Sequence, residues 1–273
     1  MRKVCMAGAA LALCASSASA QNKDTVRLLL KVSANYRACR SYRSEATWTR
    51  KIGDKQHSAG IVLAAQRPNL FRLSATGSYF DTEVACDGKE LTALRTERKV
   101  FTRTMAPKQL IGARVLKGVD LPAPATRIIS LLLEGRWQDS SDPLAARLVR
   151  AEISGPQGFG DSLAYVLTFD YDADYTARVY VTQDDSIVRR VALYQGGTPT
   201  IVENLTKVEF DKPLSPGGFA LKLPEGARLL ASLPAPDEPT VPVAIGVQTL
   251  DGRTIRFADL KGKMIFLTFF FST

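Results

Sequence analysis

The chain has 273 residues, a formal net charge of +9 at pH 7, 45% apolar residues and 23% charged residues. These proportions are those of a globular protein, and they exclude a collagen-like or largely disordered chain. The single histidine, His57, excludes His-rich zinc, copper or iron sites, and any Ser-His-Asp or Cys-His site would depend on it. The sequence therefore supplies no complete catalytic site, and it predicts no metal site and no cofactor.

Residues 1–20 have the organisation of a secretory signal peptide. A basic start is followed by a short apolar run over residues 4–15 and by Ala-Ser-Ala at residues 18–20, a small-residue cleavage site before Gln21. The apolar run is shorter than the ~20 residues that a membrane-spanning helix needs. The sequence predicts export to the periplasm, with no transmembrane anchor after the signal peptide is removed.

The net charge that remains after cleavage is positive and favours anionic partners. Loss of Arg2 and Lys3 lowers the net charge from +9 to +7. A basic exported protein is not expected to meet nucleic acid, and its anionic partners would be lipid headgroups or acidic polysaccharide. The alternative is an ordinary solvated basic surface. Lipid anchoring at Cys14 is not favoured, because Leu13 stands where a lipoprotein signal has a small residue.

Two cysteines, Cys39 and Cys86, remain after the signal peptide. An even pair in an oxidising compartment favours a disulfide. The bond would close a loop of 47 residues, which stabilises a fold by ~3–4 kcal/mol in the loop-entropy model. Two buried free thiols and a redox-active pair are the alternatives.

One helix is expected first, and strands follow it. Residues 24–38 are predicted to form an amphipathic helix, because five of them lie near helical spacing: Val26, Leu29, Leu30, Ser33 and Tyr36. From Tyr42 the period changes to two, and Asp87-Gly88 is a strong hairpin signal. The predicted strands cover residues 42–49, 61–65, 71–73, 79–85, 90–94 and 100–104.

Helices interrupt the strands in the middle of the chain. Pro107 is expected to begin a helix that ends near residue 117, and residues 125–133 form another that Gly135 ends. Residues 144–151 fit a short helix or a strand. Strands return at residues 163–169, 179–181, 188–193 and 201–210. This order predicts an α+β domain built on one curved antiparallel sheet.

Several short motifs resemble, in their order, the periplasmic lipoprotein-carrier (LolA/LolB-like) superfamily. They cover residues 42–46 (Tyr-Arg-Ser-Glu-Ala), 67–73 (Arg-Pro-Asn-Leu-Phe-Arg-Leu), 86–91 (Cys-Asp-Gly-Lys-Glu-Leu), 205–210 (Leu-Thr-Lys-Val-Glu-Phe), 219–221 (Phe-Ala-Leu) and 224–227 (Pro-Glu-Gly-Ala). The resemblance covers roughly residues 23–230. It implies a half-barrel sheet with helices on the concave side, and a cavity there that holds acyl chains.

A curved sheet with one apolar face needs a cover, which can be helices alone or helices with a ligand. The concave-face candidates are Trp48, Leu63, Phe71, Leu73, Tyr165, Leu167, Phe169 and Val181. One interpretation is a dry core, and the other is a cavity for an acyl chain or lipid.

The end of the chain resembles a different family. A proline-rich linker over residues 232–242 follows the predicted domain of residues 21–231. Residues 250–263 (Leu-Asp-Gly-Arg-Thr-Ile-Arg-Phe-Ala-Asp-Leu-Lys-Gly-Lys) and the apolar run after them resemble the start of a thioredoxin-like redoxin domain of the alkyl hydroperoxide reductase/thiol-specific antioxidant group. Residues 243–273 would then be an incomplete thioredoxin-like segment.

In that family the apolar strand leads to a cysteine at a helix N-terminus, where the thiolate is stabilised. Residues 243–273 contain no cysteine, so the activity is carried over to no residue here. We expect the sequence to be cut short from a longer parent that is an oxidoreductase or antioxidant protein. The alternative is a strand that docks on the first domain.

Three functions follow as hypotheses. The first is an exported half-barrel that binds a lipid or other apolar ligand. The second is a fragment of a two-domain thiol oxidoreductase or thiol peroxidase. The third is a structural or interaction domain that contacts another envelope protein and has no ligand.

Overall fold

The computed structural model describes residues 8–78, 80–110, 112–119, 121–234, 246–248 and 254–256. The chain forms two units, Met1–Pro236 and Asp237–Thr273. In the described part of the second unit, β13 (Gly246–Gln248) pairs antiparallel with β14 (Thr254–Arg256). The remainder of the segment for which a redoxin start is predicted, and most of the proline-rich linker, lie outside the described residues.

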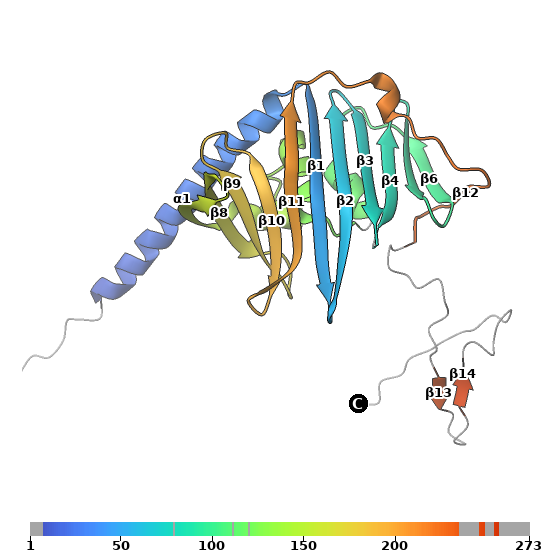
Figure 1. Ribbon diagram of the computed structural model, residues 1–273. Coiled ribbons are helices and arrows are strands. Elements are labelled where there is room, and N and C mark those ends of the chain that lie inside the picture. Colours follow the sequence, from blue (N-terminus) through green and yellow to red (C-terminus); the bar gives the residue numbers. More distant parts are fainter. Residues whose placement is uncertain are drawn as a thin grey trace, which may run out of the picture. The chain divides into compact units, whose positions relative to one another are not determined.

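The first unit is built on one twelve-stranded sheet (Figure 1), in the order β12-β6-β5-β4-β3-β2-β1-β11-β10-β9-β8-β7. All neighbours are antiparallel except β12 and β6, which are parallel. The strands are β1 (Ser41–Ile52), β2 (Lys55–Gln66), β3 (Leu70–Gly77), β4 (Asp81–Cys86), β5 (Glu90–Arg95), β6 (Val100–Met105), β7 (Glu152–Phe159), β8 (Ser162–Asp170), β9 (Thr176–Thr182), β10 (Val188–Gln195), β11 (Thr198–Phe210) and β12 (Arg228–Leu229).

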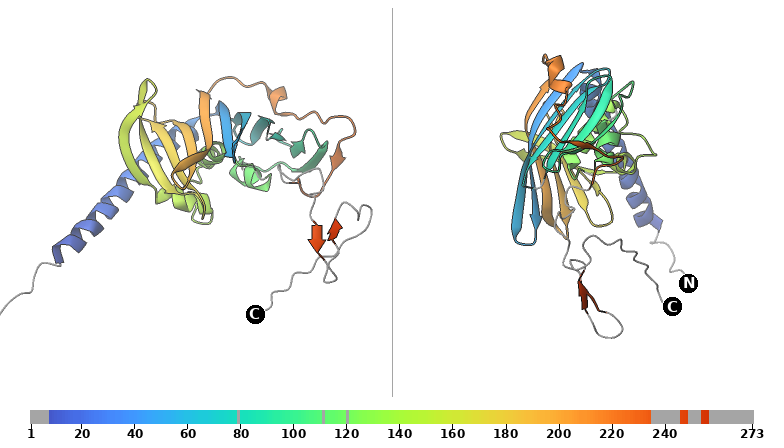
Figure 2. Two further views of the ribbon diagram at one scale, coloured as in Figure 1. Left: turned by 60° about the horizontal axis from the view of Figure 1, so that its bottom comes forward. Right: turned by 90° about the vertical axis from the view of Figure 1, so that its right-hand side faces the viewer.

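Helices cover one face of this sheet. They are α1 (Gly8–Ala38), α2 (Gly112–Gly118), α3 (Pro124–Glu134) and α4 (Pro143–Val149), and a 3-10 turn, η1 (Pro216–Phe219), follows the last long strand. Figure 2 shows the sheet curving around the inserted helices. The predicted α+β class, with a curved antiparallel sheet, an N-terminal helix and helices inserted midway, is confirmed. Within the described part of the chain, none of the helices combines the length and apolar character of a membrane span.

Period-two alternation explains how the strands build the core. In β1, Tyr42, Ala46 and Trp48 are buried, whereas Arg43 and Thr47 lie on the other face and keep contact with solvent. The Trp48 indole is fully buried, and its Nε1 donates to the Pro122 carbonyl at 2.8 Å. A buried tryptophan needs such a partner, and this bond connects the sheet to the segment that enters α3.

Strand β1 joins the two halves of the sheet. It pairs with β2 on one side and with β11, more than 140 residues later, on the other. The pairing of Tyr42 with Phe210 and of Trp48 with Glu203 sets the register of this junction. The N-terminal strands β1–β6 and the later strands β7–β11 therefore share one core.

Helix α3 lacks a side-chain cap of its own. Its N-cap position is Ala123, and Pro124 begins the helix. The Glu203 carboxylate on β11 accepts bonds from Ala125 N at 2.8 Å and from Thr126 N at 3.1 Å, and also binds the Thr126 hydroxyl. A carboxylate at a helix N-terminus satisfies unpaired N–H groups and meets the positive end of the helix dipole. Glu203 thus fixes α3 on the sheet.

The C-terminal ends of α1 and α3 are held by one arginine. The Arg67 guanidinium donates to the carbonyls of Cys39 (3.0 Å), Tyr36 (3.4 Å) and Leu133 (2.8 Å). Carbonyls at helix C-termini lack intrahelical partners, and a cation suits the negative end of the dipole. Gly135, in the left-handed conformation at φ 71°, ends α3 as predicted.

Several elements differ from the sequence predictions. Strand β7 was not predicted, because it is an edge strand with a mostly exposed pattern and contains Gly155 and Pro156. Helix α2 begins at Gly112 and not at Pro107. Residues before it continue along the sheet instead, since Ala106 N donates to Lys89 O at 2.9 Å. Leu30, predicted on the apolar face of the first helix, is 54% exposed.

The segment after β11 returns along the sheet to its far edge. Strand β12 adds to β6, with Arg228 N donating to Lys99 O at 2.9 Å and Leu230 N to Phe101 O at 2.8 Å. Arg95, only 1% exposed, donates to the carbonyls of Pro234 and Val119 and to the Thr82 hydroxyl. The described end of the first unit is therefore fixed to the body of the sheet by a buried cation.

Candidate functional site: a groove between the first helix and the sheet

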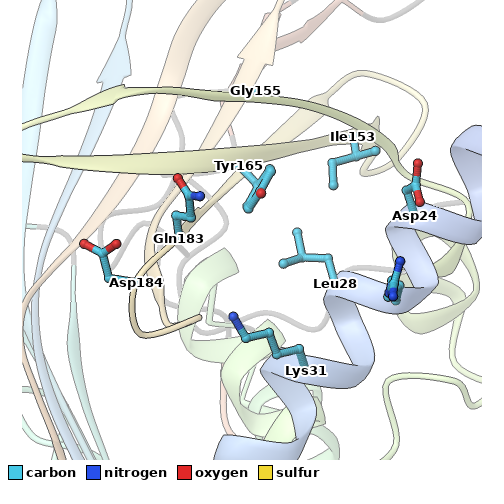
Figure 3. Close-up of a pocket in the computed structure, with 9 residues that line it drawn as sticks. Asp24, Leu28, Lys31, Ile153, Gly155, Tyr165, Gln183 and Asp184 are labelled. Atoms are coloured by element: carbon cyan, nitrogen blue, oxygen red, sulfur yellow. The ribbon is translucent and has the colours of Figure 1, made fainter.

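A groove of about 850 Å³ opens between α1 and the β7–β9 part of the sheet (Figure 3). Its lining residues are Asp24, Arg27, Leu28 and Lys31 from α1, Ile153 and Gly155 from β7, Tyr165 from β8, and Gln183 and Asp184 from the turn after β9. The site therefore combines residues from the start and the middle of the chain.

Two hydrogen bonds place α1 along this groove. At one end the buried Thr25 hydroxyl donates to the Ala151 carbonyl at 2.8 Å, just before β7. At the other end Asn35 Nδ2 donates to the Asp185 carbonyl at 2.8 Å, in the turn between β9 and β10. The stretch of helix that lines the groove, from Asp24 to Lys31, is thus positioned by contacts beside the groove.

The floor of the groove is apolar and its rim is charged. Leu28 is 9% exposed, and the partly buried Ile153 and Tyr165 pack against the same core. Figure 3 shows these three side chains converging between the helix and the strands. The rim carries the charged side chains of Asp24, Arg27, Lys31 and Asp184. Polar side chains outnumber the apolar ones in this lining, so the groove suits a ligand that has a polar head and a short apolar part.

Strand β7 is irregular where it borders the groove. The β7–β8 register shifts between Ser154 and Gln157. Gly155 there has φ +100°, and a Cβ would lie 2.9 Å from the Ala164 carbonyl oxygen. A residue other than glycine would be strained at this position. The bulge thus depends on Gly155, which itself lines the groove.

The eight predicted concave-face residues all lie on the helix-covered face. Seven are less than a tenth exposed and belong to the hydrophobic core: Trp48, Leu63, Phe71, Leu73, Leu167, Phe169 and Val181. Leu63 is paired with Leu73, and Tyr165 with Val181, so these residues form two groups on the two halves of the sheet. Tyr165 is the member of the set that lines the groove.

Cys39 and Cys86 are free, buried thiols in the structure. The expected disulfide is not formed there, and the arrangement is the predicted alternative of two free thiols. Cys39 Sγ donates to the Tyr36 carbonyl at 3.1 Å at the end of α1, whereas Cys86 ends β4 and pairs with Phe71. Burial raises the pKa of both thiols, which makes them poor nucleophiles near neutral pH.

The helix residues that line the groove are spaced in the sequence so that they share one helix face, but they were not predicted as site residues. Asp24, Leu28 and Lys31 are four and three residues apart, and Arg27 is four from Lys31, so they share one helix face. Periodicity alone does not indicate which strand this face meets. The β7 and turn residues carried no comparable signal, because β7 itself was not predicted. Among the described residues, no group of His, Cys, Asp or Glu could hold a metal ion.

Together these features define a class: an exported α+β protein with one curved antiparallel sheet, a helix-lined concave face and a groove at one end of it. A family profile described as "Predicted periplasmic protein (DUF2092)" matches residues 27–231. The chain belongs to this family, and the protein is periplasmic, as the sequence of residues 1–20 predicts. No curated protein matches the chain significantly in sequence.

Solved structures with similar folds have low sequence identity to this chain. An uncharacterized conserved protein from Thermus thermophilus is 11% identical over 76% of this chain and 98% of that one, with a TM-score of 0.49. A LolA superfamily protein from Nitrosomonas europaea is 10% identical over 72% of this chain and 97% of that one, with a TM-score of 0.33. A chain of the MucA/MucB complex of Pseudomonas aeruginosa is 14% identical over 73% of this chain and 61% of that one, with a TM-score of 0.41.

Proposed function

We propose that the protein is a periplasmic binding protein whose groove takes an apolar chain of a lipid or of a lipid-modified protein. The polar head of the ligand would lie at the charged rim. The observation that carries this proposal is an apolar floor of Leu28, Ile153 and Tyr165 that opens to solvent beside a concave face otherwise occupied by packed core residues.

The dimensions and charges of the groove support this ligand class. About 850 Å³ is within the range of sites that hold small amphipathic molecules. Each methylene moved from water to the floor would contribute about 0.8 kcal/mol. Arg27 and Lys31 could meet a phosphate or carboxylate, and Asp24 and Asp184 an ammonium group. A lipid with a charged or zwitterionic head combines all three features.

The test uses two substitutions on the same helix. Leu28→Gln keeps the side-chain size and makes the floor polar, whereas Leu30→Gln changes an exposed leucine outside the groove lining. Binding of a fluorescent fatty-acid probe to the periplasmic protein is measured after delipidation. We expect the Kd of Leu28→Gln to rise at least about tenfold through loss of apolar contact, and that of Leu30→Gln to stay within about twofold.

Thermal unfolding of both variants separates lost binding from lost folding. Equal affinity of the two variants for the probe, with both folded, would contradict the proposal. So would the absence of probe binding to the delipidated wild-type protein. Native mass spectrometry of protein purified without detergent gives an independent reading, because bound lipid adds a discrete mass.

A second candidate function rests on the sequence of residues 250–263, which resembles the start of a redoxin domain. In this proposal residues 21–231 form the binding domain, residues 232–242 a linker and residues 243–273 part of a thioredoxin-like domain of a thiol oxidoreductase. The test is the intact mass and thiol content of the protein made by its own cell. A mass above that of residues 21–273, with additional titratable cysteines, is the expected result, and a mass equal to it would contradict the proposal.

A further inference from the structure

The outer face of the sheet, opposite the helices, carries a cluster of arginines and aromatic rings. We call Phe159, Arg178, Tyr180, Arg190 and Tyr194 the outer-face cluster. Strands β7, β9 and β10 contribute them, and the register pairs Tyr180 with Arg190 and Arg178 with Ala192. Val179, Val181 and Val191, which alternate with them, are buried in the core. The cluster therefore points away from the helices and from the groove.

Each arginine of the cluster is stacked against aromatic rings. The Arg178 guanidinium carbon lies 4.4 Å from the Tyr194 ring centroid. That of Arg190 lies 5.1 Å from the Phe159 ring and 5.6 Å from the Tyr180 ring, and its Nε also binds Asn204 Oδ1. The Phe159 and Tyr180 rings are themselves 5.5 Å apart. Stacking holds a guanidinium plane in place and leaves N–H groups at its edge available.

These two arginines differ from the ion-paired arginines of the chain. Six others each lie within 4 Å of a carboxylate: Arg43, Arg72, Arg103, Arg127, Arg136 and Arg189. Over the described ranges, neither Arg178 nor Arg190 forms an ion pair. Glu152 and Asp170 lie on the same face of β7 and β8, and in that described part of the sheet they too form no ion pair with either arginine. The cluster thus presents two oriented cations without a counter-ion from the described residues.

We propose that the outer-face cluster is a docking surface for an acidic segment of a protein partner. The partner's carboxylates would accept hydrogen bonds from Arg178 and Arg190. Arginine, tyrosine and other large aromatic residues are the types that dominate binding energy in protein interfaces. A guanidinium group already lies over each of the three rings, which leaves less ring surface for the sugar stacking that a polysaccharide would need. This inference does not depend on the lipid-binding proposal, because the groove lies on the opposite side of the sheet.

The experiment measures binding of a fluorescein-labelled decaglutamate peptide to the periplasmic protein by fluorescence anisotropy. The double variant Arg178→Gln/Arg190→Gln is compared with Lys51→Gln/Lys55→Gln, which removes the same charge from the exposed β1–β2 hairpin. We expect the Kd to rise at least about tenfold for the arginine variant and less than about twofold for the lysine variant.

A third variant tests geometry against charge. Arg178→Lys/Arg190→Lys keeps both charges and loses the planar fork, so we expect its affinity to fall at least about fivefold. Undiminished binding by this variant, or equal losses in the arginine and lysine variants, would overturn the proposal. The assignment to a protein partner would also be overturned if hyaluronate or phosphatidylglycerol vesicles bound the wild-type protein and not Arg178→Gln/Arg190→Gln while decaglutamate bound neither. Fatty-acid probe binding, measured in parallel, reports on the groove alone.

Discussion

Glu203 is a carboxylate on β11 with no exposure to solvent. Its three hydrogen-bond donors favour the charged form, but burial outweighs them and raises its pKa to about 7. Glu134, at the other end of α3, has its pKa raised to about 7 by burial as well. An acid with a pKa higher in the folded than in the unfolded state binds its proton more tightly when folded. Stability from such a group falls as pH rises from its unfolded toward its folded pKa.

We therefore expect the wild-type protein to lose stability between about pH 4.5 and pH 7. The part due to Glu203 is on the order of 3 kcal/mol in total, with a slope of at most about 1.4 kcal/mol per pH unit. Glu203→Gln should remove the contribution of Glu203 to this pH-dependent loss of stability. The contribution of Glu134 should remain. Thermal unfolding at constant ionic strength from about pH 4.5 to about pH 8 measures the two slopes.

The control for this prediction is Glu209→Gln, which lies on the same strand and pairs with Lys207 near solvent. It should leave the pH dependence as in the wild type. A Glu203→Gln protein with an unchanged slope over this range would show that Glu203 keeps an ordinary affinity for its proton.

At the scale of elements, helix α2 contains two glycines in different surroundings. A Cβ on Gly112 would lie 2.6 Å from Phe71 Cε2 and 3.0 Å from Ser130 Oγ, whereas one on Gly118 would meet nothing within 4 Å. We expect Gly112→Ala to lower the free energy of unfolding by about 1–3 kcal/mol through overpacking. Gly118→Ala should leave it unchanged or raise it by up to about 1 kcal/mol, because the unfolded chain loses freedom.

Urea unfolding of the two alanine variants provides the measurement. Each variant is the control for the other, since both add one methyl group to the same short helix. Equal free energies of unfolding for Gly112→Ala and Gly118→Ala would mean that α2 and β3 can move apart enough to accommodate the added methyl group. In that case Gly112 would not be the reason for the close approach of α2 to Phe71.

How far the sequence determined these elements depended on their local signals. Strict alternation in Leu163–Phe169 predicted β8, and Asp87-Gly88 predicted the β4–β5 hairpin, where the Asp87 carboxylate accepts bonds from Lys89 N and Glu90 N. Strand β7 has no such pattern, because most of its residues face solvent and a bulge interrupts it. Its course follows from pairing with β8.

The groove could not have been predicted for a related reason. Leu28 and Tyr165 are far apart in sequence, and hydrophobic periodicity reports which face of an element is buried, not which element it meets. Seven of the eight concave-face candidates are buried in the core, and Tyr165 packs against that core. Whether such a residue lies in the packed core or in the open groove depends on where α1 crosses the sheet. The hydrogen bonds of Thr25 and Asn35 to distant parts of the chain determine that position.

For the first unit as a whole, the junction of β1 with β11 means that neither half of the sheet is an independent body. Helix α3 contacts α1, α2, α4, β10 and β11. The two tryptophans report on different places, because Trp48 is buried in β1 and Trp137 is buried in the connection from α3 to α4. Contacts this distant in sequence form slowly and together.

We expect the first unit to unfold in one cooperative transition. Equilibrium urea unfolding of Trp48→Phe and Trp137→Phe variants leaves one tryptophan reporter in each. The fluorescence curves of the two variants should have the same m-value. In each variant, circular dichroism and fluorescence should give the same midpoint. Separate midpoints for fluorescence and circular dichroism in one variant would show that the halves of the sheet unfold independently.

The bulge in β7 has a consequence for how the molecule meets copies of itself. A sheet that ends in a long regular strand offers a row of free N–H and C=O groups on which another chain can add. At one end of this sheet, Pro156 has no N–H to offer and the register shift interrupts the ladder beside it. At the other end, β12 consists of two residues. Both borders of a broad sheet are thus poor templates for strand addition, which favours a protein that stays dispersed at high concentration.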